Sequence, residues 1–185
     1  IDLTWLPVSD FAKDAADITA ALEAIGRTLR EGPLRLQVQS SGTAATGVHR
    51  LLASRATSRV QIETTPVMRG TVHPIRTMRV QPNVEQRFGF AEIQVLDFAD
   101  LYAGKLAAAL SRQHPRDLFD VEPLLKDGRL DERLWRTFLV YLTCSPRPAY
   151  EMLDPSEPRD FEQTFAAHFQ GMTARPTTAA ALLDV

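Results

Sequence analysis

The sequence predicts an α+β fold, in which a sheet with helices is followed by a region made only of helices. Two observations support this fold class. Segments in which apolar and polar residues alternate, as in half-buried strands, occur only in the first 96 residues. From residue 97 onward, apolar residues recur at the three- and four-residue spacing of helices. We therefore divide the chain into an α/β core, residues 1–96, and a C-terminal helical region, residues 97–185.

The core region is predicted to begin with a strand and one long helix. Ile1, Leu3 and Trp5 alternate with polar residues, which predicts a strand over residues 1–6. An amphipathic pattern over residues 10–30 predicts a helix. After the helix we expect strands that pair as an antiparallel sheet, together with a basic hairpin or long loop. These ranges are strands at 34–39, 48–54, 59–65 and 91–96, a turn at 40–47, and the basic segment at 66–89.

Two helices joined by a tight elbow are predicted at the start of the helical region. Asp97 is a candidate N-cap for a helix that runs to Arg112. The His114-Pro115 pair ends this helix and starts another, because proline suits the first turn of a helix. The remaining ranges are helices at 131–144 and 158–171, a short turn near 149–153, and a tail at 173–185 with little packing information.

The elbow concentrates charged residues. Lys105 and Arg112 are seven residues apart, so both project from one edge of the first helix, beside its apolar stripe. Asp117 and Asp120 share one side of the second helix with Arg116. The pattern fits a solvated face with weak ion pairs, and it equally fits a cluster that binds phosphate.

Composition excludes several classes of function. The net charge of −2 and the pI of about 6.1 indicate no global basicity, so any nucleic-acid contact requires a local patch. The single Cys144 cannot form an intrachain disulfide, which agrees with a reducing cytoplasm. No clustered Cys or His pattern suggests zinc, and no apolar run or signal peptide indicates a membrane or export role. We therefore expect a cytoplasmic protein with no membrane partner.

Two strand carboxylates suggest a metal site. Asp2 lies on the first predicted strand and Glu63 lies within the strand at 59–65. Either residue alone is typical of a solvent-facing position on a half-buried strand. On adjacent strands, however, two carboxylates repel each other unless a cation lies between them, and a pair of oxygen ligands suits Mg²⁺.

The segment KLAAALSRQHPRDLFD, residues 105–120, resembles the signature K-x-x-A-x-x-x-R-x-x-x-R-D-x-x-D of the AbiEii-type nucleotidyltransferases. These enzymes are the toxins of type IV, abortive-infection toxin–antitoxin systems. IDLTWLP also resembles the end of the family's D-x-D strand, RVQIETTP its third acidic strand, and LVYLTCSPRPAYEMLDP the helical segment after the signature. The resemblance covers nearly the whole chain. It implies a DNA polymerase β-like nucleotidyltransferase fold, with a mixed sheet and a C-terminal helical bundle.

The resemblance implies roles for particular residues. Asp2 matches the second acid of the D-x-D pair and Glu63 the third carboxylate, which together would bind Mg²⁺. Lys105 matches the lysine that contacts the nucleoside triphosphate. The other signature residues match supporting cations, Arg112 and Arg116, and two acids, Asp117 and Asp120, of which we favour Asp117 as essential.

The implied activity is Mg²⁺-dependent transfer of a nucleoside monophosphate from an NTP to an acceptor, with RNA, and tRNA in particular, as the expected acceptor. The basic segment at 69–87 is a candidate contact surface for the RNA acceptor. The implied partner is an antitoxin, which need not touch the toxin directly. The family's glycine-rich element and first acid would precede Ile1, so we expect this sequence to be a piece of a longer product. Two alternatives stay open: an impaired copy that only binds nucleotide, RNA or protein, and a phosphodiester hydrolase.

Overall fold

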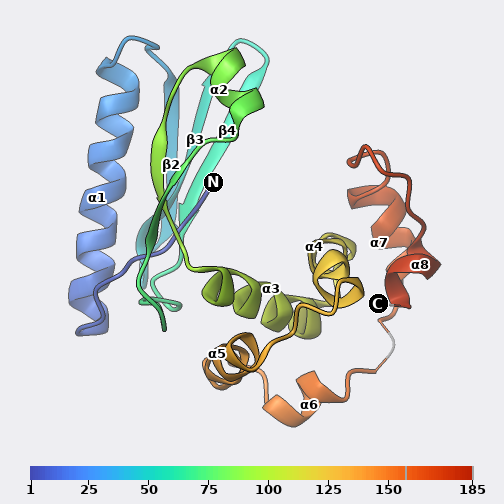
Figure 1. Ribbon diagram of the computed structural model, residues 1–185. Coiled ribbons are helices and arrows are strands. Elements are labelled where there is room, and N and C mark those ends of the chain that lie inside the picture. The colour runs from blue at the N-terminus through green and yellow to red at the C-terminus, as the bar shows by residue number, and fades with distance from the viewer. Residues whose placement is uncertain (157, 185) are drawn as a thin grey trace. The chain divides into compact units, whose positions relative to one another are not determined.

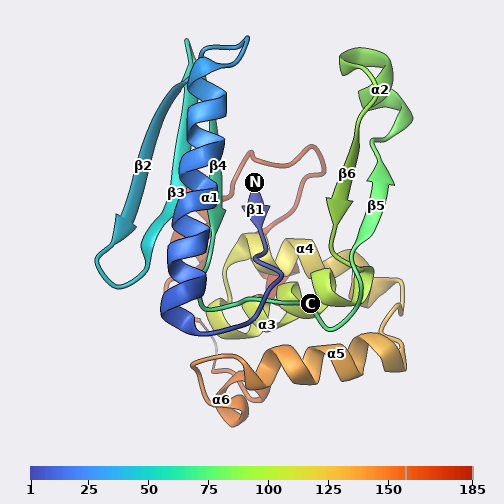
Figure 2. The ribbon, with the colours of Figure 1, turned by 90° about the vertical axis from the view of Figure 1, so that its left-hand side faces the viewer.

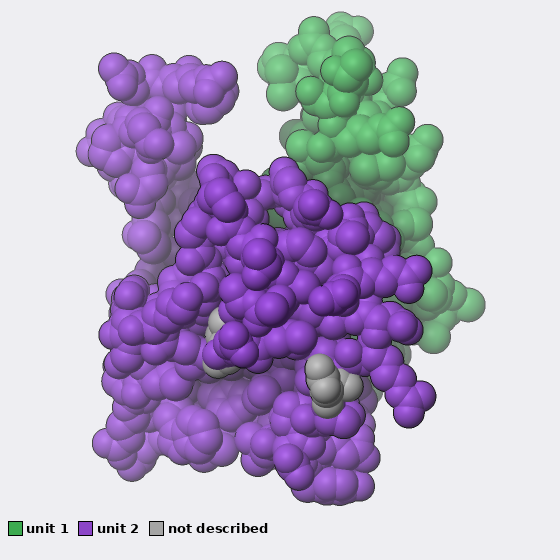
Figure 3. All heavy atoms as spheres, turned by 90° about the vertical axis from the view of Figure 1, so that its right-hand side faces the viewer, with its two compact units in different colours: residues 1–70 green, residues 71–185 purple. Residues whose placement is uncertain are grey.

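The computed structural model describes residues 1–156 and 158–184 of the chain (Figure 1). The chain forms two compact units, residues 1–70 and residues 71–185, which Figure 3 shows in different colours. The segment 71–96, which was expected to belong to the α/β core, is part of the second unit.

A four-stranded mixed sheet forms the first unit together with one helix. The strand order is β1-β4-β3-β2. Strand β1, Asp2–Leu3, pairs parallel with β4, Ser58–Thr64, whereas β4 pairs antiparallel with β3, Gly47–Arg55, and β3 with β2, Gln37–Thr43. The predicted antiparallel sheet is therefore confirmed for three strands, and the parallel β1 makes the sheet mixed.

Helix α1, Phe11–Glu31, packs on one face of this sheet (Figure 2). It begins after Asp10, whose carboxylate accepts hydrogen bonds from two backbone N–H groups of the first turn and so satisfies donors that have no partner in the helix. The core of the unit lies between α1 and the sheet and consists of Ile18, Leu22, Leu51 and Ile62, with partly buried apolar residues around them. The predicted helix over residues 10–30 is confirmed.

Three sequence predictions in this unit need correction. The strand expected over residues 34–39 begins only at Gln37. The strand expected over residues 1–6 ends at Leu3, because the backbone then leaves the sheet and the carbonyl of Trp5 accepts from the N–H of Gly70. The turn expected over residues 40–47 is wrong for residues 40–43, which continue β2 and pair with β3 through a bulge at Ser41/Gly42. Polar residues persist there because β2 is an edge strand with exposed side chains.

The second unit begins with a small antiparallel hairpin. Strand β5, Arg76–Arg79, pairs with β6, Glu92–Val95, and the helix α2, Pro82–Phe88, lies in the connection between them. Residues 66–89 were expected to form a hairpin or a long loop, but they contain one strand of the hairpin, β5, and the helix α2, which was not predicted. The other strand, β6, is the strand predicted at 91–96. None of the residues in α2 is buried.

Three longer helices follow and share one apolar cluster. Helix α3, Phe98–Arg112, contacts both α4, Pro115–Lys126, and α5, Glu132–Thr143. The cluster includes Ala103, which is fully buried on α3, and Phe138 on α5. The predicted helices and the break between α3 and α4 are confirmed.

The last three helices are short. They are α6, Ala149–Leu153, α7, Phe161–His168, and α8, Ala179–Leu183. Leu182 of α8 is fully buried with Phe161 and Phe169 in a second cluster. The tail therefore carries packing information that its sequence did not reveal. In the described part of the chain, no helix has the length and apolar character needed to cross a membrane.

Candidate functional site

The parallel pairing of β1 with β4 places two carboxylates side by side. Asp2 and Glu63 are partners in the register of these strands, so their side chains lie on the same face of the sheet. The neighbouring residue Ile62 points to the opposite face and is buried in the core against α1. Asp2 is exposed and Glu63 is half-buried, so both are on the face that is turned away from α1.

Neighbouring side chains hold Glu63 in place. Arg50 of β3 donates from Nε to Oε2 of Glu63 at 3.0 Å, and Gln61 donates from Nε2 to the same oxygen at 2.8 Å. No group of three or more His, Cys, Asp or Glu side chains is arranged to hold a metal ion among the residues that the structure describes. The carboxylate pair nevertheless fits Mg²⁺, which commonly takes one or two protein carboxylates and completes its coordination with water and substrate phosphates.

The elbow between α3 and α4 follows from three adjacent residues. Gln113 ends α3 with a left-handed backbone, at a φ of 48°. The Nδ1 atom of His114 then accepts from the N–H of Arg116, which caps α4, and Pro115 takes the first helical position. Burial, partly opposed by the charge of Asp117, lowers the pKa of His114. The lowered pKa favours the neutral imidazole, which is the form whose Nδ1 accepts a hydrogen bond.

Two ion pairs join α3 to α4 across the elbow. Lys105 donates from Nζ to Oδ2 of Asp120 at 2.5 Å, and Arg112 donates from Nη2 to Oδ1 of Asp117 at 2.7 Å. The two interpretations of this cluster remain, because partly exposed ion pairs occur both on solvated faces and in phosphate sites. Arg116, the remaining charged residue of the signature, is exposed.

Asp117 differs from the other charged residues of the elbow. Its side chain is only 15% exposed, and its Oδ2 atom is buried with no hydrogen-bond partner in the described part of the chain. A buried oxygen without a donor is costly and is typical of strained or functional positions. This atom distinguishes Asp117 from Asp120, whose side chain is 39% exposed.

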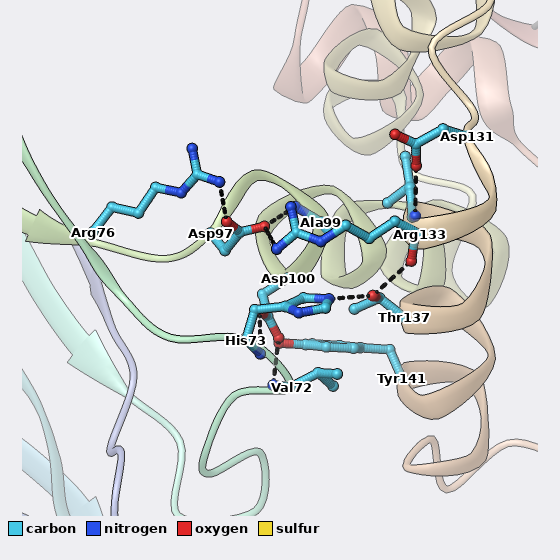
Figure 4. Close-up of polar contacts among 11 residues, drawn as sticks. Val72, His73, Arg76, Asp97, Ala99, Asp100, Asp131, Arg133, Thr137 and Tyr141 are labelled. Carbon is cyan, nitrogen blue, oxygen red and sulfur yellow. Dashed lines mark hydrogen bonds and ion pairs between the residues drawn. The ribbon is translucent and has the colours of Figure 1, made fainter.

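A buried acid at the start of α3 was predicted only as an N-cap. Asp97 accepts from the N–H of Ala99 at 3.0 Å, as a cap does, and also pairs with Arg76 at 2.6 Å and Arg133 at 3.0 Å (Figure 4). Burial opposes its ionisation, but the hydrogen bonds and the two guanidinium groups outweigh burial and lower the pKa of Asp97.

A second buried acid, Asp100, was missed. It accepts from the backbone N–H groups of Val72 at 2.7 Å and His73 at 3.0 Å, and from the hydroxyl of Tyr141 at 3.1 Å (Figure 4). Burial, with the adjacent Asp100 carboxylate, raises the pKa of Tyr141. The sequence did contain one signal for the burial of Asp100. It precedes Ala103 by three residues and therefore lies on the same, buried face of α3. The network fixes the start of the helix that carries Lys105.

The predicted site residues thus form two clusters. The carboxylate pair, Asp2 and Glu63, belongs to the first unit, and the elbow cluster of Lys105, Arg112, Arg116, Asp117 and Asp120 belongs to the second.

An α+β chain with a small mixed sheet, a carboxylate pair on that sheet and a basic elbow suits a nucleotidyltransferase. Residues 1–184 match the family model described as "Nucleotidyl transferase AbiEii toxin, Type IV TA system". The chain therefore belongs to the AbiEii family of nucleotidyltransferase toxins, as its signature segment predicted. Neither a curated protein nor a solved structure gives a significant match.

Proposed function

We propose that this protein is a Mg²⁺-dependent nucleotidyltransferase that moves a nucleoside monophosphate from an NTP to RNA, with tRNA as the expected acceptor. It acts as the toxin of a type IV toxin–antitoxin system. Family membership over residues 1–184 supports the reaction class, and an antitoxin is the partner that this class implies. The observation that carries the proposal for this chain is the register that pairs Asp2 with Glu63 on one face of the sheet.

The carboxylate pair is assigned to the metal. Asp2 and Glu63 present oxygen ligands from adjacent strands, and Mg²⁺ bound there would neutralise charge on the triphosphate. Backbone pairing, which includes the hydrogen bond from the N–H of Glu63 to the carbonyl of Ile1, keeps the two residues on adjacent strands at one register position.

The elbow cluster is assigned to the nucleotide. Lys105 is the residue proposed to contact the triphosphate, with Arg112 and Arg116 as supporting cations. Asp120 and Asp117 hold Lys105 and Arg112 in place through the ion pairs between α3 and α4. Because Asp117 keeps one buried oxygen without a donor, it is the acid we assign as essential.

Nucleotidyl transfer needs an aligned hydroxyl and a stabilised leaving group. A hydroxyl oxygen of the acceptor loses its proton to water and bonds to the α-phosphorus, the bond from that phosphorus to the oxygen that bridges it to the β-phosphorus breaks, and pyrophosphate leaves. Fixed cations near the phosphate oxygens favour this step, because they stabilise the negative charge that develops on the leaving pyrophosphate in the transition state.

A labelling experiment with active-site variants tests the assignment. The complete protein is incubated with Mg²⁺, total RNA and each of the four labelled NTPs in turn, alongside Asp2→Ala and Lys105→Ala. We expect one NTP, or a subset, to label RNA, and we expect both variants to lose the label. If Lys105→Ala keeps the full rate while folding normally, the role of the elbow is wrong.

A second candidate is a binding module that has lost catalysis. It is favoured by one observation, that within the described residues the carboxylate pair is not joined by a third metal-ligating side chain. This candidate predicts that NTP or RNA binds to the folded protein while no NTP labels RNA. A phosphodiester hydrolase would differ from both the transferase and the binding module, because it would shorten the RNA without incorporating label.

A further inference from the structure

A charged row crosses three strands of the first sheet. In the register of the sheet, Arg50 on β3 faces Glu63 on β4, and Glu63 faces Asp2 on β1. Paired residues of neighbouring strands point to the same side, so all three side chains lie on the face turned away from α1. Arg50 is thus the third member of the row that contains the proposed metal ligands.

The ion pair with Arg50 involves Oε2 of Glu63, an oxygen that is a potential ligand of the divalent cation. Arg50 Nε and Gln61 Nε2 both donate to Oε2 of Glu63, at 3.0 and 2.8 Å. A carboxylate oxygen that accepts two hydrogen bonds, one of them from a cation, is a poorer ligand for a second cation.

The side chains in this row are accessible enough to rearrange. The side chain of Arg50 is 47% exposed and that of Glu63 is 34% exposed. Partly exposed ion pairs contribute little to stability, so exchanging the partner of Arg50 is inexpensive. A triphosphate oxygen is the natural alternative partner, because guanidinium groups bind phosphate in the same planar geometry that they use for carboxylate.

We propose that Arg50 is a positioning residue that competes with the divalent cation for Glu63 and moves to a phosphate group when the cation arrives with a triphosphate. This inference rests on the proposed metal site and adds a coupling to it. The cation alone binds weakly because it must displace Arg50 from Glu63. The cation with a triphosphate binds more tightly because the displaced guanidinium gains a new anionic partner.

Binding of Mn²⁺ alone, followed by the paramagnetic resonance signal of the free ion, tests the first half of the proposal. The variant is Arg50→Gln and its matched control is Arg59→Gln. Arg59 is exposed on the same face of β4 as Glu63, four residues or about 13 Å away, so its removal changes the net charge equally. We expect Arg50→Gln to bind Mn²⁺ roughly fivefold more tightly than Arg59→Gln, as loss of an exposed ion pair implies.

Calorimetric titration with the Mg²⁺ complex of inorganic tripolyphosphate tests the second half without requiring the preferred base. We expect Arg50→Gln to bind this complex more weakly than Arg59→Gln, so the variant moves the two affinities in opposite directions. Equal behaviour of the two variants in either titration would overturn the role of Arg50.

Asp2→Ala separates this outcome from failure of the metal site itself. If Asp2→Ala leaves Mn²⁺ binding unchanged, the proposed metal site is wrong and the coupling falls with it. If Asp2→Ala abolishes Mn²⁺ binding while Arg50→Gln and Arg59→Gln agree, the metal site stands and only the coupling is wrong.

Discussion

Asp2 and Glu63 share one register position on the parallel strands β1 and β4, although 60 residues separate them in the sequence. Each carboxylate by itself is typical of a solvent-facing strand position, and the two suggest a metal site only if their strands are neighbours. The pairing of β1 with β4 meets that condition. Because a shift of one residue would move one carboxylate to the apolar face against α1, the register is essential to the proposed site.

Replacing the elbow lysine should abolish nucleotide turnover. Lys105→Ala removes the cation assigned to the triphosphate and leaves Asp120 without its partner on α3. We expect the rate of turnover to fall by about 100-fold or more, the usual effect of losing a fixed group that stabilises transition-state charge. Arg136→Ala is the control, because Arg136 is exposed and pairs with Glu132 on its own helix. A rate within twofold of the control would contradict the assignment.

The buried Asp100 should be important for stability. Asp100→Asn places an amide donor where the carboxylate accepts from Val72, His73 and Tyr141. We expect the free energy of unfolding, measured in urea, to fall by about 2–4 kcal/mol, because buried donors lose their acceptor. Asp127→Asn serves as the control, since Asp127 is exposed. Equal stability of the two variants would show that Asp100 is not needed to hold residues 72–73.

Acid should destabilise the protein partly through Glu122. Hydrogen bonds from Arg175 and Lys126 lower the pKa of this buried carboxyl below its ordinary value of 4.5. The folded protein therefore releases this proton more readily than the unfolded chain. The contribution of Glu122 is fully present above pH 4.5 and is lost as the pH falls through the lowered pKa of the folded state.

Glu122→Gln should consequently flatten the dependence of stability on pH in this acidic range. Urea unfolding of the wild-type protein and the variant, measured at intervals from pH 7 to about pH 3, checks this expectation. Parallel curves for the two proteins would mean that Glu122 does not contribute to the acid sensitivity.

The last helix should contribute to the stability of the second unit. Leu182 is fully buried with Phe161 and Phe169, whereas its neighbour Leu183 is 39% exposed. We expect Leu182→Ala to lower the free energy of unfolding by about 2–4 kcal/mol, because it removes buried methyl groups and leaves a cavity. Leu183→Ala should have a much smaller effect. Similar losses for both variants would indicate that α8 does not pack as described.

Local signals predicted much of this fold. The cap at Asp97 and the His114-Pro115 break act within one turn of a helix, so the sequence contains all that is needed to recognise them. The AbiEii signature likewise lies within sixteen consecutive residues, 105–120. The structure agrees with these elements to within one or two residues.

Long-range partners were not predictable in the same way. The hydrogen bonds to Asp100 come from Val72, His73 and Tyr141, which are 28, 27 and 41 positions away in the sequence. Glu122 accepts from Arg175, which is 53 positions away. Periodicity places such residues on a helix face but does not identify what the fold brings to that face. The pairing of Arg50 with Glu63 was missed for the same reason, because it depends on the register of two strands.

The most direct test of the proposed reaction follows the position of the label within the NTP. The complete protein is given Mg²⁺, RNA and the preferred NTP, labelled at either the α- or the γ-phosphate. If the protein transfers a nucleoside monophosphate, the α-label enters RNA and the γ-label appears in pyrophosphate. With Asp2→Ala or Lys105→Ala, no label enters RNA and no labelled pyrophosphate forms. Entry of γ-label into RNA, or no labelling of RNA by any NTP from a folded protein, would contradict nucleotidyl transfer.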